Sequence, residues 1–138
     1  MKDLNLIEEY NYDLFLVNTY EEVVDLIKKG ADVNFINNEG ETPIFHNSNI
    51  DVIRYLVSCG AKINHRNNKG QTVLFKTNKL LNVARLINMG CNPFLKSADG
   101  HYHYENMTMA DRKNYSQFIE VFKNNVRKKN EERMLLSA

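Results

Sequence analysis

The sequence repeats itself every 30 residues, and this periodicity constrains the fold more than any other feature. The run at 30–40, which begins and ends with glycine, returns at 60–70 and, with more substitutions, at 90–100. A fixed period of this size is typical of stacked repeats, in which each unit buries its apolar face against its neighbour. We therefore expect three similar units, each packed against the next.

Apolar residues ahead of the first glycine of each unit keep a helical spacing. In the second unit they are Ile50, Ile53, Leu56 and Val57. These positions, i, i+3, i+6 and i+7, form one stripe along a helix. An earlier apolar pair at 44–45 recurs at 74–75. Each unit is thus predicted to contain a short helix, a turn, a longer helix that ends at glycine, and an extended loop.

The ends of the longer helices carry their own signals. Thr19 and Glu22 have the spacing of a capping box, in which the hydroxyl accepts from the Glu22 amide and the carboxylate returns to the Thr19 amide. Asn49 is the matching N-cap of the second unit. Gly30 and its counterparts Gly60 and Gly90 stand where a left-handed residue ends a helix.

The second unit resembles an ankyrin repeat. Its segments Glu41-Thr42-Pro43-Ile44-Phe45, Gly60-Ala61-Lys62-Ile63-Asn64 and Asn67-Asn68-Lys69-Gly70 are similar to three motifs of that family: threonine-proline-leucine-histidine, glycine-alanine-aspartate-valine-asparagine, and a hairpin ending in glycine. The resemblance implies an all-α, helix-turn-helix solenoid with short hairpin or loop fingers. It also implies that Asn34 and Asn64 tie their own loop backbones together. Ankyrin units have about 33 residues, and the shortage here falls between 45 and 50, so each first helix should be clipped.

We expect one domain over residues 1–138. Its predicted parts are an N-terminal cover at 1–10, repeats at 11–40, 41–70 and 71–100, a C-terminal capping repeat at 101–126, and a charged tail at 127–138. A first helix is expected around 13–18. Residues 101–114 are expected to break the register, with 107–112 as the first helix of the last unit. The tail is expected to fray, as unpacked termini do.

Composition argues against several classes of protein. The net charge of +1 gives no general attraction to nucleic acid, and two cysteines are too few for a secreted disulfide framework. No apolar run approaches a membrane span, and the N-terminus mixes acids into its apolar positions, unlike a signal peptide. These features favour a soluble cytoplasmic protein.

Site chemistry is also sparse. His101 and His103 with Cys91 could suggest zinc, but the ligand spacing of zinc sites is missing, and Cys91 replaces a small alanine of the other units. No nucleophile signature and no phosphate-binding loop occurs. We therefore expect no metal, no cofactor, no small-molecule substrate and no enzymatic activity.

The resemblance implies that a partner is held by the fingers and by the exposed side of the first helices. The residues carried over are Ile36, Asn38, Glu39, Glu41, His46, Asn47, Arg66, Asn68, Lys69, Gln71, Lys76, Thr77, Lys96, Ala98, Asp99 and His101. These positions differ between units while the core positions repeat, which favours recognition. They carry both signs of charge, which suits a protein surface better than DNA phosphates.

The sequence therefore predicts a non-catalytic module that binds another protein, for example a small inhibitor or immunity protein that occludes a toxin, effector or host factor. Two alternatives stay open. One is a structural component that self-assembles through its apolar ends at 4–10 and 134–136. The other is a protein that contacts nucleic acid through the basic residues Lys123, Arg127, Lys128, Lys129 and Arg133.

Overall fold

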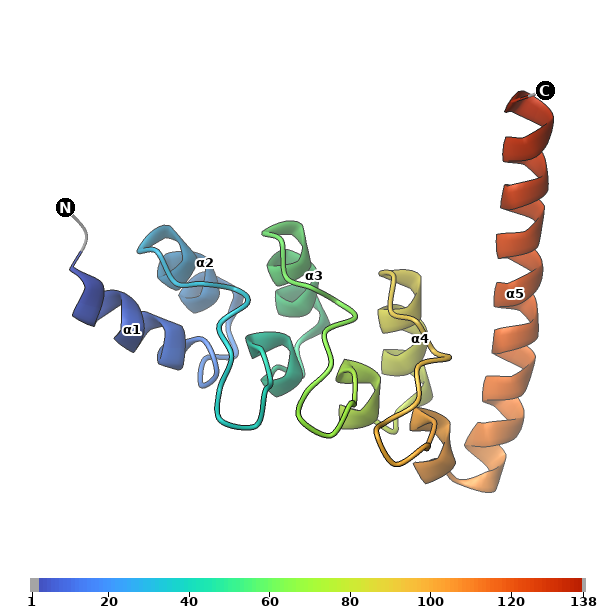
Figure 1. The fold of residues 1–138 in the computed structure, drawn as a ribbon, viewed down its shortest axis with the longest axis horizontal. Coiled ribbons are helices and arrows are strands. Elements are labelled where there is room, and N and C mark those ends of the chain that lie inside the picture. The colour runs from blue at the N-terminus through green and yellow to red at the C-terminus, as the bar shows by residue number, and fades with distance from the viewer. Residues whose placement is uncertain (1–2, 138) are drawn as a thin grey trace. The chain divides into compact units, whose positions relative to one another are not determined.

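The computed structural model describes residues 3–137, and this part of the chain is all-helical, without strands (Figure 1). The prediction of an all-α protein is thereby confirmed. Its elements are α1 (Leu4–Asp13), α2 (Tyr20–Lys28), the 3-10 helix η1 (Pro43–His46), α3 (Ile50–Ser58), η2 (Val73–Lys76), α4 (Leu80–Asn88), η3 (His103–Asn106) and α5 (Met109–Ser137). The chain divides into two compact units, one ending at His103 and the other beginning at Tyr104. The single domain expected over 1–138 stays a prediction.

In the second and third repeats the first helix is reduced to one 3-10 turn. In η1 the turn is closed by the amide of Phe45, which donates to the Thr42 carbonyl at 3.0 Å. Pro43 opens it with a preset φ, and the extended Asn47 ends it. The same bond recurs in η2, from Phe75 to Thr72 at 3.1 Å. The short segment between η1 and α3 leaves room for only a single turn, so the prediction of a shortened first helix is confirmed for these repeats.

The longer helices begin at side-chain caps in two units of three. Asn49 accepts from the Asp51 amide at 3.0 Å, and Thr19 accepts from the Glu22 amide at 3.3 Å. The return bond of the capping box differs from the prediction, because the Glu22 carboxylate accepts from the Thr19 hydroxyl at 2.7 Å. α4 follows Lys79 and has no side-chain cap.

Each longer helix ends in the same way. Gly30, with φ +107°, follows the last turn of α2, and the next amide, that of Ala31, donates back to the Leu26 carbonyl at 3.0 Å. Ala61 and Cys91 make the equivalent bonds to Leu56 and Leu86. The placement of the glycines at helix ends is therefore confirmed.

The core of this unit is a stripe of apolar side chains that recurs with the repeat. Equivalent positions of α2, α3 and α4 are buried, and so are equivalent positions just before or within the 3-10 turns. They are Val23, Ile53 and Val83; Leu26, Leu56 and Leu86; and Leu14, Ile44 and Leu74. α2 packs beside α3, and η1 packs beside η2 (Figure 1). Each repeat thus covers the apolar face of the one before it.

Asparagine side chains join consecutive units. The Asn34 side chain donates to the Gly60 carbonyl at 3.0 Å and accepts from the Lys62 amide at 2.9 Å. Asn64 makes the same pair of bonds to Gly90 at 3.1 Å and Asn92 at 2.7 Å. The expectation that these amides bond within their own loops is wrong, because each side chain bonds the backbone of the following unit.

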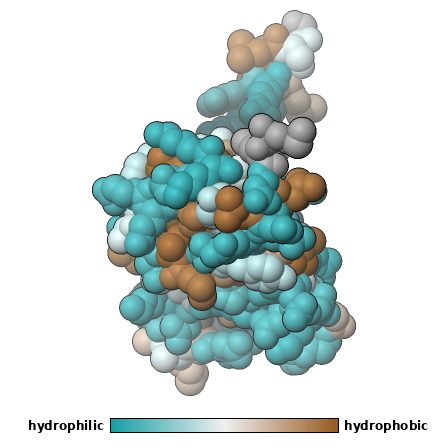
Figure 2. All heavy atoms as spheres, turned by 90° about the vertical axis from the view of Figure 1, so that its left-hand side faces the viewer, coloured by the Kyte–Doolittle hydropathy of each residue, from teal (hydrophilic) through white to brown (hydrophobic). Residues whose placement is uncertain are grey.

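The N-terminal helix supplies a substitute for this junction. The Asn11 side chain accepts from the Asp32 amide at 2.6 Å, the bond that Asn34 makes to Lys62. α1 therefore includes residues assigned to the first repeat. The first helix expected at 13–18 is replaced by a turn, in which Leu16 donates to Asp13 at 2.9 Å. Figure 2 faces this end, where hydrophobic residues lie among hydrophilic ones.

The C-terminal part departs from two predictions. η3 follows η2 after 30 residues, so the register is kept through Asn106 and the break expected at 101–114 does not occur there. The first helix expected at 107–112 is also wrong, because the turn at 103–106 takes that role and α5 starts at Met109. α5 continues without interruption to Ser137, through the residues predicted as a fraying tail.

The packing of the apolar stripe can be tested by replacing leucine with alanine at one buried and one exposed position. Leu56 on α3 is 1% exposed, and Leu81 on α4 is 61% exposed. Leu56→Ala should lower the free energy of unfolding by about 2–5 kcal/mol, because it leaves a cavity. Leu81→Ala should stay within about 0.5 kcal/mol of the wild type. Urea denaturation measures both, and equal losses would contradict the packing described.

Candidate functional site

The tips of the three long loops, at 38–40, 68–70 and 98–100, form a row, here called the tip row. Their backbones are hydrogen-bonded to one another. The amide of Asn68 donates to the Glu39 carbonyl at 3.0 Å, and the amide of Ala98 donates to the Lys69 carbonyl at 2.9 Å. The Asn68 side chain adds a bond to the Asn38 carbonyl at 3.0 Å. These bonds fix the spacing of the tips, while the side chains of Glu39 and Lys69 stay exposed.

Glycine is required where neighbouring tips approach. Gly40 has φ +73°, and a Cβ there would lie 2.3 Å from the Asn68 Oδ1 atom. Gly70 has φ +70°, and a Cβ there would lie 2.7 Å from the Ala98 nitrogen. Both the backbone conformation and the close contact exclude a side chain at these positions. The close spacing of the tips therefore depends on glycine at these two positions.

Each loop is also closed internally by a polar side chain at its start. The Asn37 Oδ1 atom accepts from the amides of Glu39 at 2.9 Å and Glu41 at 3.0 Å. Asn67 repeats both bonds at 3.0 Å, to Lys69 and Gln71. Sequence reasoning treated the asparagine pairs at these loops only as turn residues and missed this closure. Their recurrence 30 residues apart was the available signal.

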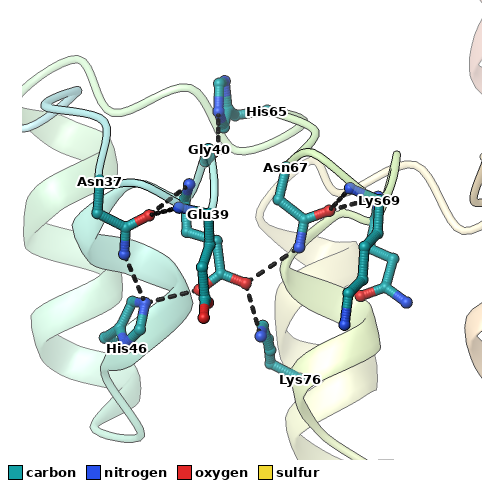
Figure 3. Close-up of polar contacts among 10 residues, drawn as sticks. Asn37, Glu39, Gly40, His46, His65, Asn67, Lys69 and Lys76 are labelled. Carbon is teal, nitrogen blue, oxygen red and sulfur yellow. Dashed lines mark hydrogen bonds and ion pairs between the residues drawn. The ribbon is translucent and has the colours of Figure 1, made fainter.

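A buried carboxylate lies behind the tips and joins the second unit to the third (Figure 3). Glu41 is 1% exposed. Its Oε1 atom lies 2.6 Å from the Lys76 Nζ atom and accepts from the Asn67 side chain at 3.0 Å. Its Oε2 atom lies 2.6 Å from the His46 Nε2 atom. A proton on that nitrogen makes His46 the donor. The carboxylate is thus surrounded by donors from two units.

The electrostatics of Glu41 follow from these partners. Burial alone would raise the pKa of the carboxyl group. Hydrogen bonds from Lys76 and Asn67, together with the charges of Lys76 and His46, outweigh burial and hold the pKa below its ordinary 4.5. The group therefore stays ionised at neutral pH and acts as an acceptor within the protein.

Most residues predicted to contact a partner are exposed, two are half-buried and two are buried. The exposed ones are Ile36, Asn38, Glu39, His46, Arg66, Asn68, Lys69, Lys76, Lys96, Ala98, Asp99 and His101. Gln71 and Thr77 are half-buried. Glu41 and Asn47 are buried, so the expectation that they face a partner is wrong. Glu41 is enclosed by its network, and Asn47 donates to the Val17 carbonyl at 3.0 Å.

Two of the exposed residues also serve the scaffold. The Arg66 Nε atom donates to the Gly70 carbonyl at 3.0 Å, and its guanidinium group also donates to the Lys96 carbonyl of the next unit. Asn68 spans to Asn38, as described above. Substituting either residue would therefore disturb the spacing of the tips as well as their surface.

Of the three residues considered for a zinc site, Cys91 and His103 lie in the core and His101 is exposed. Cys91 is buried, which raises the pKa of its thiol to about 12, and its Sγ atom lies 3.5 Å from the Ile63 carbonyl oxygen. His103 is buried, and burial lowers its pKa to about 4. Across residues 3–137, no three His, Cys, Asp or Glu side chains are grouped so that they could hold a metal ion. Within the same span, no helix combines the length and apolar character needed to cross a membrane.

The buried carboxylate predicts a pH dependence. Because the folded pKa of Glu41 lies below its unfolded value, the unfolded chain binds more protons as pH falls, so stability should decrease as pH drops below about 5. Glu41→Gln should remove this component and should cost about 1–3 kcal/mol at pH 7, because the donors lose a charged acceptor. Urea denaturation at several pH values measures both effects.

The control is Glu39→Gln, which changes an exposed acid of the same loop. It should stay within about 0.5 kcal/mol of the wild type at pH 7. The third unit has Gln71 at the position of Glu41, so this loop tolerates the amide side chain. Equal losses in the two variants, with an unchanged pH slope for Glu41→Gln, would contradict the role of the network.

Comparison with known proteins assigns no family to the chain. No family model matches it, and a search of the curated proteins finds no significant match. The family and the function of this chain are therefore inferred from its own residues and contacts.

Proposed function

We propose that residues 11–100 are a shortened ankyrin-type solenoid whose row of loop tips binds another protein. Support for the family comes from the match of the second unit to the ankyrin pattern, from two junctions of one kind between repeats, and from a related bond between α1 and the first loop. Asn34 and Asn64 make the same two bonds 30 residues apart, and Asn11 makes one of them. A regular stack of this kind presents its loops as one extended surface.

The rigid tip row with changing side chains is the observation that carries the binding proposal. Backbone bonds from Asn68 to Glu39 and from Ala98 to Lys69 hold the tips at a fixed spacing. The side chains at the tips change from glutamate to lysine to aspartate along the row. A preorganised surface loses little entropy on binding, and its affinity is raised accordingly.

The charge pattern favours a protein as the partner. Glu39, Lys69 and Asp99 alternate in sign and are exposed. Nucleic acid would require a row of cations against its phosphates, whereas a protein surface can offer complementary charges at each tip. The binding is proposed to be non-catalytic, because the buried carboxylate in the same loops, that of Glu41, is already occupied by internal donors.

A second candidate is self-assembly through the end of the stack that carries α1. Leu4 is 77% exposed and Leu16 is 75% exposed, and Figure 2 shows hydrophobic residues at this end. Exposed apolar groups of this kind can mark an interface. Light scattering over a range of concentrations distinguishes the two candidates, since a monomer at every concentration would remove this one.

The binding proposal is tested by removing the tip charges together. Glu39→Ala, Lys69→Ala and Asp99→Ala in one chain should abolish capture of the partner by the immobilised protein. Loss of tip residues removes the variable contacts but leaves the backbone bonds of the row in place. Extract of the producing cells serves as the source, and mass spectrometry identifies what is bound.

The matched control changes the same charges on the three longer helices. Glu21→Ala on α2, Asp51→Ala on α3 and Arg85→Ala on α4 also remove two acids and one base, all exposed. This variant should retain the partner. A partner captured equally by the tip variant and the wild type would contradict binding through the row.

A further inference from the structure

A cleft lies between the second and third repeats, on the side of the short linkers that follow η1 and η2. Its volume is about 330 Å³, which is at the lower end of the range of ligand sites. Its lining includes buried Ile53, Val73 and Leu86, and exposed His46 and Lys79. The cleft therefore combines an apolar floor with a polar rim.

The cleft is open because one pair of asparagines is not repeated. Between the first and second units, Asn47 donates to the Val17 carbonyl at 3.0 Å and Asn49 donates to the Asn18 carbonyl at 3.4 Å, so the linkers are bridged. The corresponding residues of the third unit are Thr77 and Lys79. Within the described chain neither side chain bonds to the linker at 47–49, so the two linkers stay unbridged.

The rim of the cleft has a single sign of charge. Its ionisable lining residues are His46, Lys76 and Lys79, and no carboxylate lines it. His46 and Lys76 contact Glu41, which lies behind them. Lys79 is exposed and has no carboxylate partner among residues 3–137. The ammonium group of Lys79 is therefore available to an anion from outside the protein.

The start of α4 adds hydrogen-bond donors at the same place. Thr19 and Asn49 cap α2 and α3, but Lys79, at the equivalent position, provides no side-chain cap. The first amides of α4 therefore have no side-chain acceptor, and the helix dipole favours a negative group near them. Asn82, in the first turn of this helix, lines the cleft.

We propose that this cleft binds an acidic segment of a partner protein, in which an aspartate or glutamate lies next to an apolar side chain. The carboxylate would pair with Lys79 at the start of α4, and the apolar side chain would cover Val73 and its neighbours. The inference rests on the proposed function and names the chemistry of the partner. A small inorganic anion would satisfy the rim but would leave the apolar floor in water.

Two short peptides test the chemistry directly. The probes are acetyl-Ser-Leu-Asp-Ser-amide and its neutral counterpart with asparagine, titrated into the full chain labelled with ¹⁵N. The acidic peptide should shift the amides of 46–48 and 76–82 and bind at least about five-fold more tightly. That advantage should shrink as sodium chloride rises from about 20 to about 300 mM. Sodium acetate is titrated in parallel as an anion without an apolar group.

The chain itself offers a variant that should close the cleft. Thr77→Asn with Lys79→Asn rebuilds the pair present at 47 and 49, so it should keep the fold, bridge the linkers and remove the cation. The acidic peptide should lose at least about ten-fold in affinity. Lys62→Asn, which removes an exposed lysine outside the cleft, should leave binding unchanged. If the double variant unfolds, Lys79→Gln replaces it and should lose the preference for aspartate.

Several results would overturn the proposal. They are equal binding of both peptides, shifts outside the cleft, acetate binding as tightly as the acidic peptide, or unchanged binding in the cleft variants. Failure of the cleft proposal can be distinguished from failure of the proposed binding through the tip row. A partner that is lost by the tip variant but retained by the double cleft variant would support the proposed function and contradict the cleft. If the cleft binds the acidic peptide but the immobilised protein captures no partner through its tips, the cleft is supported and the binding role of the tip row is contradicted.

Discussion

The bond of an asparagine side chain to the backbone of the next unit is the contact on which the stack depends. An amide side chain has a donor and an acceptor on adjacent atoms, so Asn34 satisfies both the Gly60 carbonyl and the Lys62 amide. The stability of a repeat stack is the sum of the stabilities of its units and of the interfaces between neighbours. A bond that recurs at each junction therefore adds to the interface made by the buried apolar stripe. Asn11 makes the same kind of bond from a helix, which explains how α1 can serve as the first cover.

The short repeat changes how neighbouring units fill the space between them. One 3-10 turn replaces the first helix, so the linker that follows it lies close to the buried apolar stripe. Side chains then decide whether adjacent linkers are bridged. Asn47 and Asn49 bridge the first pair, while Thr77 and Lys79 leave the second pair open. The cleft is thus a consequence of period and composition together.

The period made the helices, their glycine ends and their buried stripe predictable, because each depends on spacing within one unit. Contacts between units were not predictable in this way. Glu41 was expected at the surface because the resemblance placed it on a finger, yet Asn67 of its own unit and Lys76 of the next unit enclose it. The turn at His103–Asn106 was missed because none of its residues matches the residue at the equivalent position of η1, although a single 3-10 turn makes few demands on sequence.

Variation between repeats has two physical meanings, and the structure separates them. A change at an exposed tip, such as Glu39 to Lys69, alters the surface charge of the row and leaves its backbone bonds in place. A change from Asn49 to Lys79 removes a helix cap, which is worth about 1 kcal/mol, and a bridge between linkers at the same time. The proposed acidic segment would supply an acceptor at the start of α4 and would occupy the space between the unbridged linkers, so the proposed cleft site depends on position 79 more than on any other.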